Sequence, residues 1–261
     1  MKQFILNAAP DRNGRVRLED GDYRYLVRVR RLAPGEYFPA LLPGGDAVTV
    51  RVVSVDNHAL VGEVFPGECT QGECPPPAPI VLLQALPRGG KMDIIVRQAA
   101  EGGTAEIVPF VSEFSVTKIA NSDNQKLARW QRIIREARQQ SGSAAVKIHQ
   151  PVSMDGLFTY WEQFKTRHPG AVGLLFHHLP LAQESLHRYL DTYPEAAAIA
   201  IGPEGGFSPA EAERFLAAGF RPFTIGSSIL RTETAALYAQ AAVRILLAER
   251  DSWETKQKTK N

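Results

Sequence analysis

The most restrictive stretch of the sequence is the turn that follows the apolar run AAAIAI at residues 196–201. It reads GPEGGF and leads directly into SPAEAE. Ser208, Pro209 and Glu211 predict a helix start, because serine caps helices, proline suits the first helical position, and glutamate three residues after the cap completes a capping box. Gly202–Phe207 is then the whole connection between a buried strand and a helix. Ligands bind beyond the carboxyl ends of strands in open α/β sheets, and glycines let the backbone approach them closely, so this turn is a candidate ligand site.

A second restricted turn, FTIGSSILRTETA, lies further along the chain. Gly226 follows the strand-like FTI, and Thr232 or Thr234 can cap the helix that comes next. Arg231 stands at the start of this helix, where a cation opposes the macrodipole, so its position calls for a functional reason. The first turn contains neither the dinucleotide fingerprint nor the Walker pattern, which argues against an NAD or NTP enzyme. Two glycine turns at one edge of a sheet predict one shared pocket.

From Ile80 onward, the apolar runs IVLLQAL, AEIVPFV, VGLLF, AAIAI and PFTIG alternate with helical stretches. This alternation is typical of an α/β domain with a parallel sheet and helices on its faces. A helix is expected over 124–140, with a buried stripe of Trp130, Ile133, Ile134 and Ala137. The last helix is expected from Thr232 to Glu249, and its largely apolar surface indicates that it is either central in its domain or packed against a second subunit.

Residues 1 to about 65 contain short strand-like runs, namely QFIL, GRVRLE, YRYLVRV, AVTVRVVSV and ALVGEVF. They predict a small β-barrel or sandwich. The proline-rich segment Pro66–Pro79 is interpreted as a stiff linker. The expected domains are 1–70, a small barrel, and 80–249, an α/β domain, followed by a polar, frayed tail at 250–261.

The overall charge does not by itself indicate a nucleic-acid-binding protein, because the net charge is only +2. No stretch reaches the ~18 apolar residues of a membrane span, and the N-terminus is a poor signal peptide, so a cytoplasmic, soluble protein is expected. Cys69 and Cys74 have no further ligands at zinc spacing and are interpreted as two loop thiols, with no metal site. Adjacent histidines on a strand point to opposite faces, so His177 and His178 are better suited to a pocket wall than to one metal ion.

The pair GPEGG and ILRTETA resembles the signature of the RsmE family of 16S rRNA uridine-N3 methyltransferases, within the SPOUT superfamily. The segments RGGKMDIIVRQAAEGGTAEIVPFVSE and ARWQRIIREARQQSG are similar to further family segments, and YLVRVRRL extends the resemblance to the N-terminal domain. The chain departs from the family pattern at Tyr25, Gly102 and Ser143, positions that tend to face RNA or to support the fold.

The resemblance implies a C-terminal SPOUT domain tied in a trefoil knot, a PUA-like RNA-binding barrel at the N-terminus, and a homodimer formed through the C-terminal domain. It also implies S-adenosylmethionine as the methyl donor. The residues expected to bind this cofactor are Leu175, Phe176, Ile201, Gly202, Pro203, Glu204, Gly205, Gly206, Ile225, Gly226, Ile229, Leu230 and Thr234.

The chemistry implied by the resemblance is an in-line methyl transfer to uracil N3, which must lose its proton first. Arg231 is predicted to stabilise the uracil anion, and Glu233 and Glu204 are candidates for the proton acceptor. Glu204 can equally be a structural hydrogen-bond acceptor. Clustered cations over 12–31 and 118–147 predict contact with 16S rRNA or the small ribosomal subunit, with no DNA or membrane partner. The residues expected to bind RNA are Arg15, Arg28, Arg30, Arg31, Arg129 and Arg132.

Two other functions fit the same sequence. One is another SPOUT RNA methyltransferase with a different target. The other is a non-catalytic RNA-binding factor in ribosome assembly, against which the intact glycine turns argue.

Overall fold

The computed structural model divides the chain into two compact units. One comprises Met1–Pro75 and Arg138–Ala145, and the other comprises Pro76–Ala137 and Val146–Asn261. The structure describes residues 4–66, 78–116, 123–177, 181–192, 194–226 and 228–258. Cys69, Cys74, His178 and most of the expected linker Pro66–Pro79 lie outside the described residues.

The N-terminal unit is built on a five-stranded sheet with the order β1-β3-β4-β5-β2. Its strands are β1 (Phe4–Ile5), β2 (Arg15–Glu19), β3 (Tyr37–Leu41), β4 (Ala47–Val55) and β5 (Ala59–Pro66). All neighbouring pairs are antiparallel except β1 with β3, which is parallel. The side chains of Phe38, Val50 and Leu60 are fully buried in its core, because alternate residues of these strands face inward.

One predicted strand is wrong, since the run YRYLVRV is helical. A short helix α1 (Asp20–Tyr23) continues directly into a π-helix η1 (Arg24–Val29). Leu26 of this segment is fully buried, whereas Val29 is 69% exposed. The aromatic and β-branched composition of the run suggested a strand, and packing on the core of the unit overrode that propensity.

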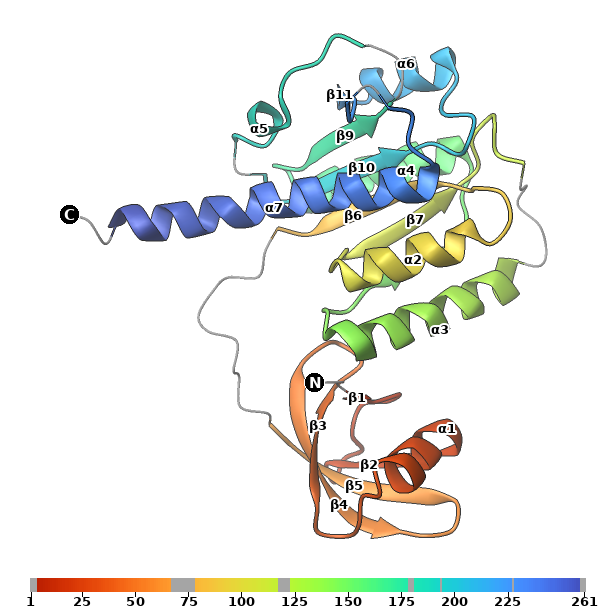
Figure 1. Ribbon diagram of the computed structural model, residues 1–261, viewed down its shortest axis with the longest axis vertical. Helices are drawn as coiled ribbons and strands as arrows, with labels where there is room; N and C mark the ends of the chain where they lie inside the picture. Colours follow the sequence, from red (N-terminus) through yellow and green to blue (C-terminus); the bar gives the residue numbers. More distant parts are fainter. Residues whose placement is uncertain are drawn as a thin grey trace. The chain divides into compact units, whose positions relative to one another are not determined.

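The C-terminal unit contains a six-stranded sheet with the order β11-β9-β10-β6-β7-β8 (Figure 1). Its strands are β6 (Ile80–Ala85), β7 (Glu106–Phe110), β8 (Lys147–Ile148), β9 (Val172–Phe176), β10 (Ala197–Ile201) and β11 (Phe220–Phe223). Every neighbouring pair is parallel. The predicted α/β domain with a parallel sheet is therefore confirmed, and its strands end together at one edge.

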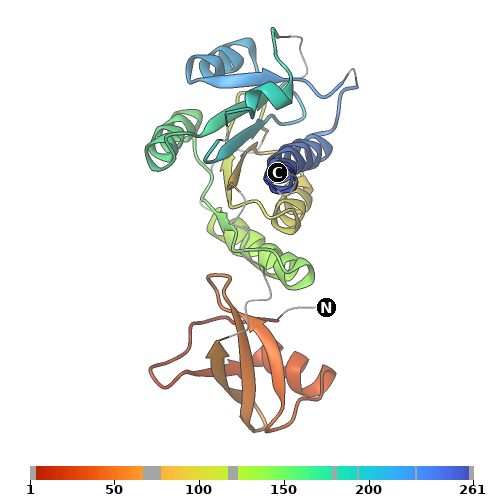
Figure 2. The same cartoon turned by 90° about the vertical axis from the view of Figure 1, so that its left-hand side faces the viewer.

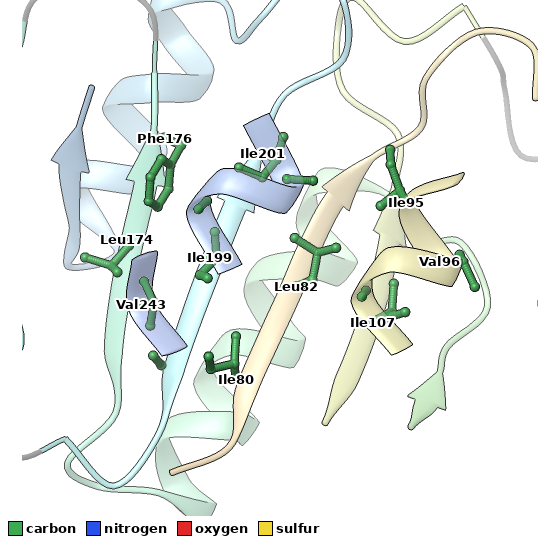
Figure 3. Packing of buried hydrophobic residues seen from close by; sticks show 14 of the residues in the cluster. Ile80, Leu82, Ile95, Val96, Ile107, Leu174, Phe176, Ile199, Ile201 and Val243 are labelled. Atoms are coloured by element: carbon green, nitrogen blue, oxygen red, sulfur yellow. The ribbon is translucent and has the colours of Figure 1, made fainter. Parts of the chain in front are cut away.

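Helices cover both faces of this sheet, as Figure 2 shows for α2 (yellow) and α7 (blue) on one side and α4 (green) on the other. The helices are α2 (Lys91–Glu101), α3 (Asp123–Ser141), α4 (Met154–Arg167), α5 (Leu186–Tyr189), α6 (Pro209–Ala217) and α7 (Thr232–Lys258). Within β6, Leu82 packs toward α2 and α7, whereas Leu83 packs toward α4 and α6. Figure 3 shows the first of these layers, where Ile95 and Val243 lie over the strands. Burial on both faces fixes the positions of the strand ends.

The helix predicted over 124–140 is confirmed as α3, and α7 begins at Thr232 as expected. However, α7 continues to Lys258, past the predicted end at Glu249. No glycine or proline interrupts this segment, so its polar composition alone does not end the helix. Neither α7 nor any other helix within the described ranges has the length and apolar composition needed to cross a membrane.

A polar cluster ties the first residue of β7 to the neighbouring elements. The Glu106 carboxylate accepts hydrogen bonds from His149 Nε2 (2.6 Å), the Tyr160 hydroxyl (3.0 Å) and Arg167 Nη1 (3.2 Å). Burial acts to raise the pKa of Glu106, but the hydrogen bonds from these three side chains outweigh it and lower the pKa to about 2. The charged carboxylate therefore stabilises the fold.

The pKa of Glu106 predicts how stability depends on pH. Because the folded pKa of about 2 lies below the ordinary value of 4.5, its contribution is full above pH 4.5 and is lost as the pH falls toward 2. At pH 7, Glu106→Gln should lower the free energy of unfolding by about 2–3 kcal/mol in urea denaturation. The difference from the wild type should shrink as the pH falls from 4.5 toward 2.

The matched control is Glu162→Gln, which removes an exposed partner of Lys165 and should change stability by less than ~0.5 kcal/mol. A constant difference between Glu106→Gln and wild type across this pH range would contradict the assignment.

Candidate functional site

The turn after β10 requires glycine at position 202, because a side chain does not fit there. A Cβ atom placed there would lie 3.0 Å from the backbone carbon of Gly206. Gly206 has φ +71°, a conformation that favours glycine, and its amide donates to the Pro203 carbonyl at 2.9 Å. The predicted capping box is confirmed, since Ser208 Oγ accepts from the Glu211 amide and Glu211 Oε2 accepts from the Ser208 amide. The turn therefore presents its backbone at the end of a buried strand.

The second turn meets the first through one hydroxyl group. Thr232 is the first residue of α7, and its side chain is buried. Its hydroxyl donates to the Gly202 carbonyl at 2.6 Å and accepts from Gln84 Nε2 at 3.1 Å. Thr232 or Thr234 was expected to cap this helix, but the Thr232 hydroxyl instead joins the β10 turn, the start of α7 and the end of β6. Gly226, in the turn before α7, has φ +64°.

Where these turns meet, they enclose a pocket beyond the carboxyl ends of β9, β10 and β11. Ten of the predicted cofactor residues line it, namely Phe176, Ile201, Gly202, Pro203, Glu204, Gly206, Ile225, Gly226, Ile229 and Leu230. The other lining residues are His177, Phe223, Thr224, Ser228, Thr232 and Ala235. The two glycine turns thus share one pocket, and His177 forms part of its wall.

Three predicted cofactor residues do not line this pocket. Leu175 is fully buried in the sheet, because its side chain alternates with that of Phe176 and points to the other face. Gly205 lies at the exposed tip of its turn, where an added Cβ would be 2.9 Å from the Phe114 side chain. Thr234 is half-buried in the first turn of α7.

A third glycine turn, RGGK, follows β6 and contacts the first. The amide of Arg88 donates to both oxygens of Glu204, at 3.1 and 3.3 Å. Lys91 Nζ donates to Glu204 Oε1 at 2.7 Å. Burial acts to raise the pKa of Glu204, but the hydrogen bonds from Lys91 and from backbone amides outweigh it and lower the pKa. Glu204 is therefore an ionised carboxylate held in place at the pocket.

The two other candidate catalytic residues differ in their surroundings. Glu233 does not line the pocket, and its Oε2 atom lies 3.8 Å from Lys91 Nζ. That oxygen is buried and accepts no hydrogen bond in the described part of the chain. Arg231 is exposed, and among the described residues its guanidinium has no ion-pair partner. Water reduces the unfavourable interaction of this cation with the helix dipole, and the guanidinium is left available to a ligand.

The predicted RNA-binding arginines are mostly exposed. Arg15, Arg28 and Arg31 lie on the surface of the N-terminal unit, and Arg30 lies over the Phe38 ring at 6.0 Å. In the C-terminal unit, Arg129 forms an ion pair with Asp93, and Arg132 lies 3.9 Å from Glu136. Such exposed pairs are weak, so both guanidinium groups can exchange their partners for phosphates.

The Thr232 hydroxyl should make a measurable contribution to stability. Thr232→Val keeps the shape of the side chain but removes a buried donor from Gly202 and a buried acceptor from Gln84. The free energy of unfolding should fall by about 1–3 kcal/mol in urea denaturation. Thr232→Ser keeps the hydroxyl and should therefore retain most of the wild-type stability.

The matched control is Thr159→Val, because Thr159 is exposed on α4 and its hydroxyl donates to the Asp155 carbonyl of the same helix. It should change stability by less than ~0.5 kcal/mol. Equal effects of the two valine substitutions would show that the Thr232 bond does not hold the turns together.

Comparison with known proteins places this pocket in a family. The RNA methyltransferase domain family matches residues 74–244. The Synechocystis sp. (strain PCC 6803) protein named ribosomal RNA small subunit methyltransferase E is 31% identical over 248 residues, which are 94% of this chain and 78% of that relative.

Solved structures give the same result. The fold is similar to that of a ribosomal RNA small subunit methyltransferase E from Neisseria gonorrhoeae bound to S-adenosyl methionine. The TM-score is 0.77 at 28% identity, over 94% of this chain and 98% of that one. A Legionella pneumophila protein in complex with the bound cofactor SAM gives a TM-score of 0.74 at 26% identity, over 94% and 97% of the two chains. The chain therefore belongs to the RNA methyltransferase domain family and to the ribosomal RNA small subunit methyltransferase E family.

Proposed function

We propose that this protein transfers the methyl group of S-adenosylmethionine to N3 of a uridine in the 16S rRNA of the small ribosomal subunit. The observation that carries the proposal is the meeting of two glycine turns at one pocket, joined by Thr232, in a chain of this family. Such an enzyme acts where ribosomes assemble, which places it in the cytoplasm.

The residues of the pocket fit S-adenosylmethionine, which supplies an electrophilic methyl group when bound. The side chains of Ile201, Ile225 and Leu230 offer an apolar surface for a flat base. An added Cβ at Gly202 would lie 3.0 Å from the Gly206 backbone, and Gly206 itself has φ +71°, so the turn requires glycine at both positions and offers its backbone polar groups to a ligand. Leu175, Gly205 and Thr234 act in this proposal by supporting the lining residues beside them.

Arg231 is the residue proposed to stabilise the uracil anion, because its guanidinium is exposed, forms no ion pair within the described ranges, and lies next to the pocket residue Leu230. Glu233 is the proposed proton acceptor. One of its carboxylate oxygens accepts no hydrogen bond from any residue that the structure describes, whereas the oxygens of Glu204 are already bound by Lys91 and by the Arg88 amide. Glu204 then fixes the turn rather than taking the proton.

RNA binding is proposed for the exposed cations of both units. The residues are Arg15, Arg28, Arg30, Arg31, Arg129 and Arg132. The half-barrel arrangement of the N-terminal sheet supports a PUA-like assignment for that unit. A trefoil knot in the C-terminal unit is also proposed, and it is supported by the contact that the start of α7 makes with the turn after β10.

A homodimer through α7 is the last part of the proposal. The face of α7 toward the sheet is fully buried at Ala236, Ala239 and Val243. On the remaining surface, Leu237, Tyr238 and Ile245 are 38, 53 and 54% exposed. An apolar surface of this kind on a long helix fits a second copy of the same chain, which makes the same contact in return.

The methyl transfer is tested with purified protein, 16S rRNA and isotope-labelled S-adenosylmethionine, followed by mass mapping of the RNA. One 3-methyluridine should form.

Arg231→Met should lower kcat about 100-fold with little change in the affinity for the donor, because it removes an interaction with the transition state. The control is Arg221→Met, which removes a bond to the Tyr189 carbonyl in the same unit. A methyl group on another base would assign a different target, and no transfer despite RNA binding would favour an assembly factor.

The dimer is tested by sedimentation equilibrium. The wild-type protein should sediment as a dimer, and Tyr238→Asp combined with Ile245→Asp should shift it to monomers, because two desolvated carboxylates per chain oppose association. Exposed Leu216 on α6 provides the control, Leu216→Asp, which should leave the dimer intact. A monomeric wild-type protein would contradict this part of the proposal.

A further inference from the structure

Lys91 is a residue that the sequence motifs did not single out, yet it joins α2 to the two turns that form the pocket. It is the first residue of α2. Its ammonium lies 2.7 Å from Glu204 Oε1, in the turn after β10, and 3.8 Å from Glu233 Oε2, in the first turn of α7. These elements are far apart in sequence, so the ammonium group is a specific link between them.

The two carboxylates need this cation. The Lys91 and Glu204 side chains are only 30 and 29% exposed, and that of Glu233 is 17% exposed. Two nearby carboxylates repel each other, and a partly buried carboxylate without a cation is costly. Within the described residues, Lys91 is the only side chain that forms an ion pair with either of them.

The link bears directly on the geometry of the pocket. Glu204 lines the pocket, and its turn contributes Gly202, Pro203 and Gly206 as well. Glu233 directly follows Thr232, which also lines the pocket. Lys91 therefore acts from outside on both turns, in addition to the bond between Thr232 and Gly202 inside.

We propose that Lys91 is a positioning residue for the cofactor pocket, which holds the GPEGG turn and the start of α7 at the separation that the ligand requires. This inference rests on the proposed function. Lys91 does not line the pocket, so it acts through Glu204 and Glu233 and not by contact with the ligand.

A different role for Lys91 would be to set the electric field in the pocket. The two roles predict different results for two ligands of similar shape. S-adenosylmethionine carries a positive sulfonium, whereas its demethylated product S-adenosylhomocysteine has a neutral thioether. Loss of a positioning contact lowers the affinity for both ligands by the same factor. Loss of a positive charge alone strengthens the binding of the cation and leaves the neutral ligand nearly unchanged.

The test is calorimetric titration of the full chain with each ligand. Lys91→Met should raise the Kd of both by about tenfold, the effect of losing a partly exposed charged hydrogen bond. Lys91→Arg should restore both to within about threefold, because it keeps the charge and the donors. The matched control is Lys165→Met, which breaks an ion pair of 2.8 Å with Glu162 on α4 and should change neither Kd.

A double substitution gives a second measurement. If Lys91 acts through Glu204, the double variant Lys91→Met with Glu204→Gln should raise the Kd of each ligand no more than the single substitution with the larger effect does. Additive losses would overturn the inference. So would unchanged affinities in Lys91→Met, or a change for the sulfonium ligand alone. A wild-type protein that binds neither ligand would instead overturn the proposed function. If Lys91→Met does not fold, Lys91→Gln, which also removes the charge, takes its place in both measurements with the same expected results.

Discussion

The arrangement of the site depends on one buried hydroxyl group. Thr232 donates to the Gly202 carbonyl and accepts from the Gln84 amide, so a single side chain joins the ends of β6 and β10 to the start of α7. A hydroxyl can do this because it is both a donor and an acceptor. Thr232 and Gly202 are 30 positions apart, and within the described residues the Lys91 ion pairs are the only other polar contacts that join the two turns.

This bond can hold the two turns together because the strands beneath it are packed on both faces. Both faces of the parallel sheet are covered, and the residues of β6, β9 and β10 are buried throughout. Close packing on both sides fixes where each strand ends, and therefore where each turn begins. Glycine at 202 and 206 then lets the backbone fold back on itself at the end of β10. Outside the pocket, Lys91 joins the same two turns through its ion pairs with Glu204 and Glu233.

Local signals allowed much of this to be predicted from the sequence. The capping box at Ser208 depends on residues three positions apart, and the glycine turn precedes it directly. The parallel sheet followed from alternating apolar runs and helices. The helical run at 23–29 was mistaken for a strand, because its composition favours strands while its burial depends on the core of the unit. The length of α7 was underestimated, because polar residues do not end a helix in the absence of glycine or proline.

The contacts of Thr232 and Lys91 could not be predicted in this way. Lys91 and Glu204 are 113 positions apart, and no local pattern indicates such a partner. A glycine pair after the buried run IVLLQAL was the available signal, since it repeats the pattern of the turn after β10. Likewise, the alternation of Leu175 and Phe176 decides which of them faces the pocket, and only the register of β9 fixes that choice.

The most direct measurement is a crystal structure of the protein grown with S-adenosylmethionine. The account predicts electron density for the whole ligand between residues 202–206 and 225–230, with the bond from Thr232 to Gly202 intact. Density for the ligand elsewhere on the chain, or an empty pocket at saturating ligand with these turns separated, would contradict it.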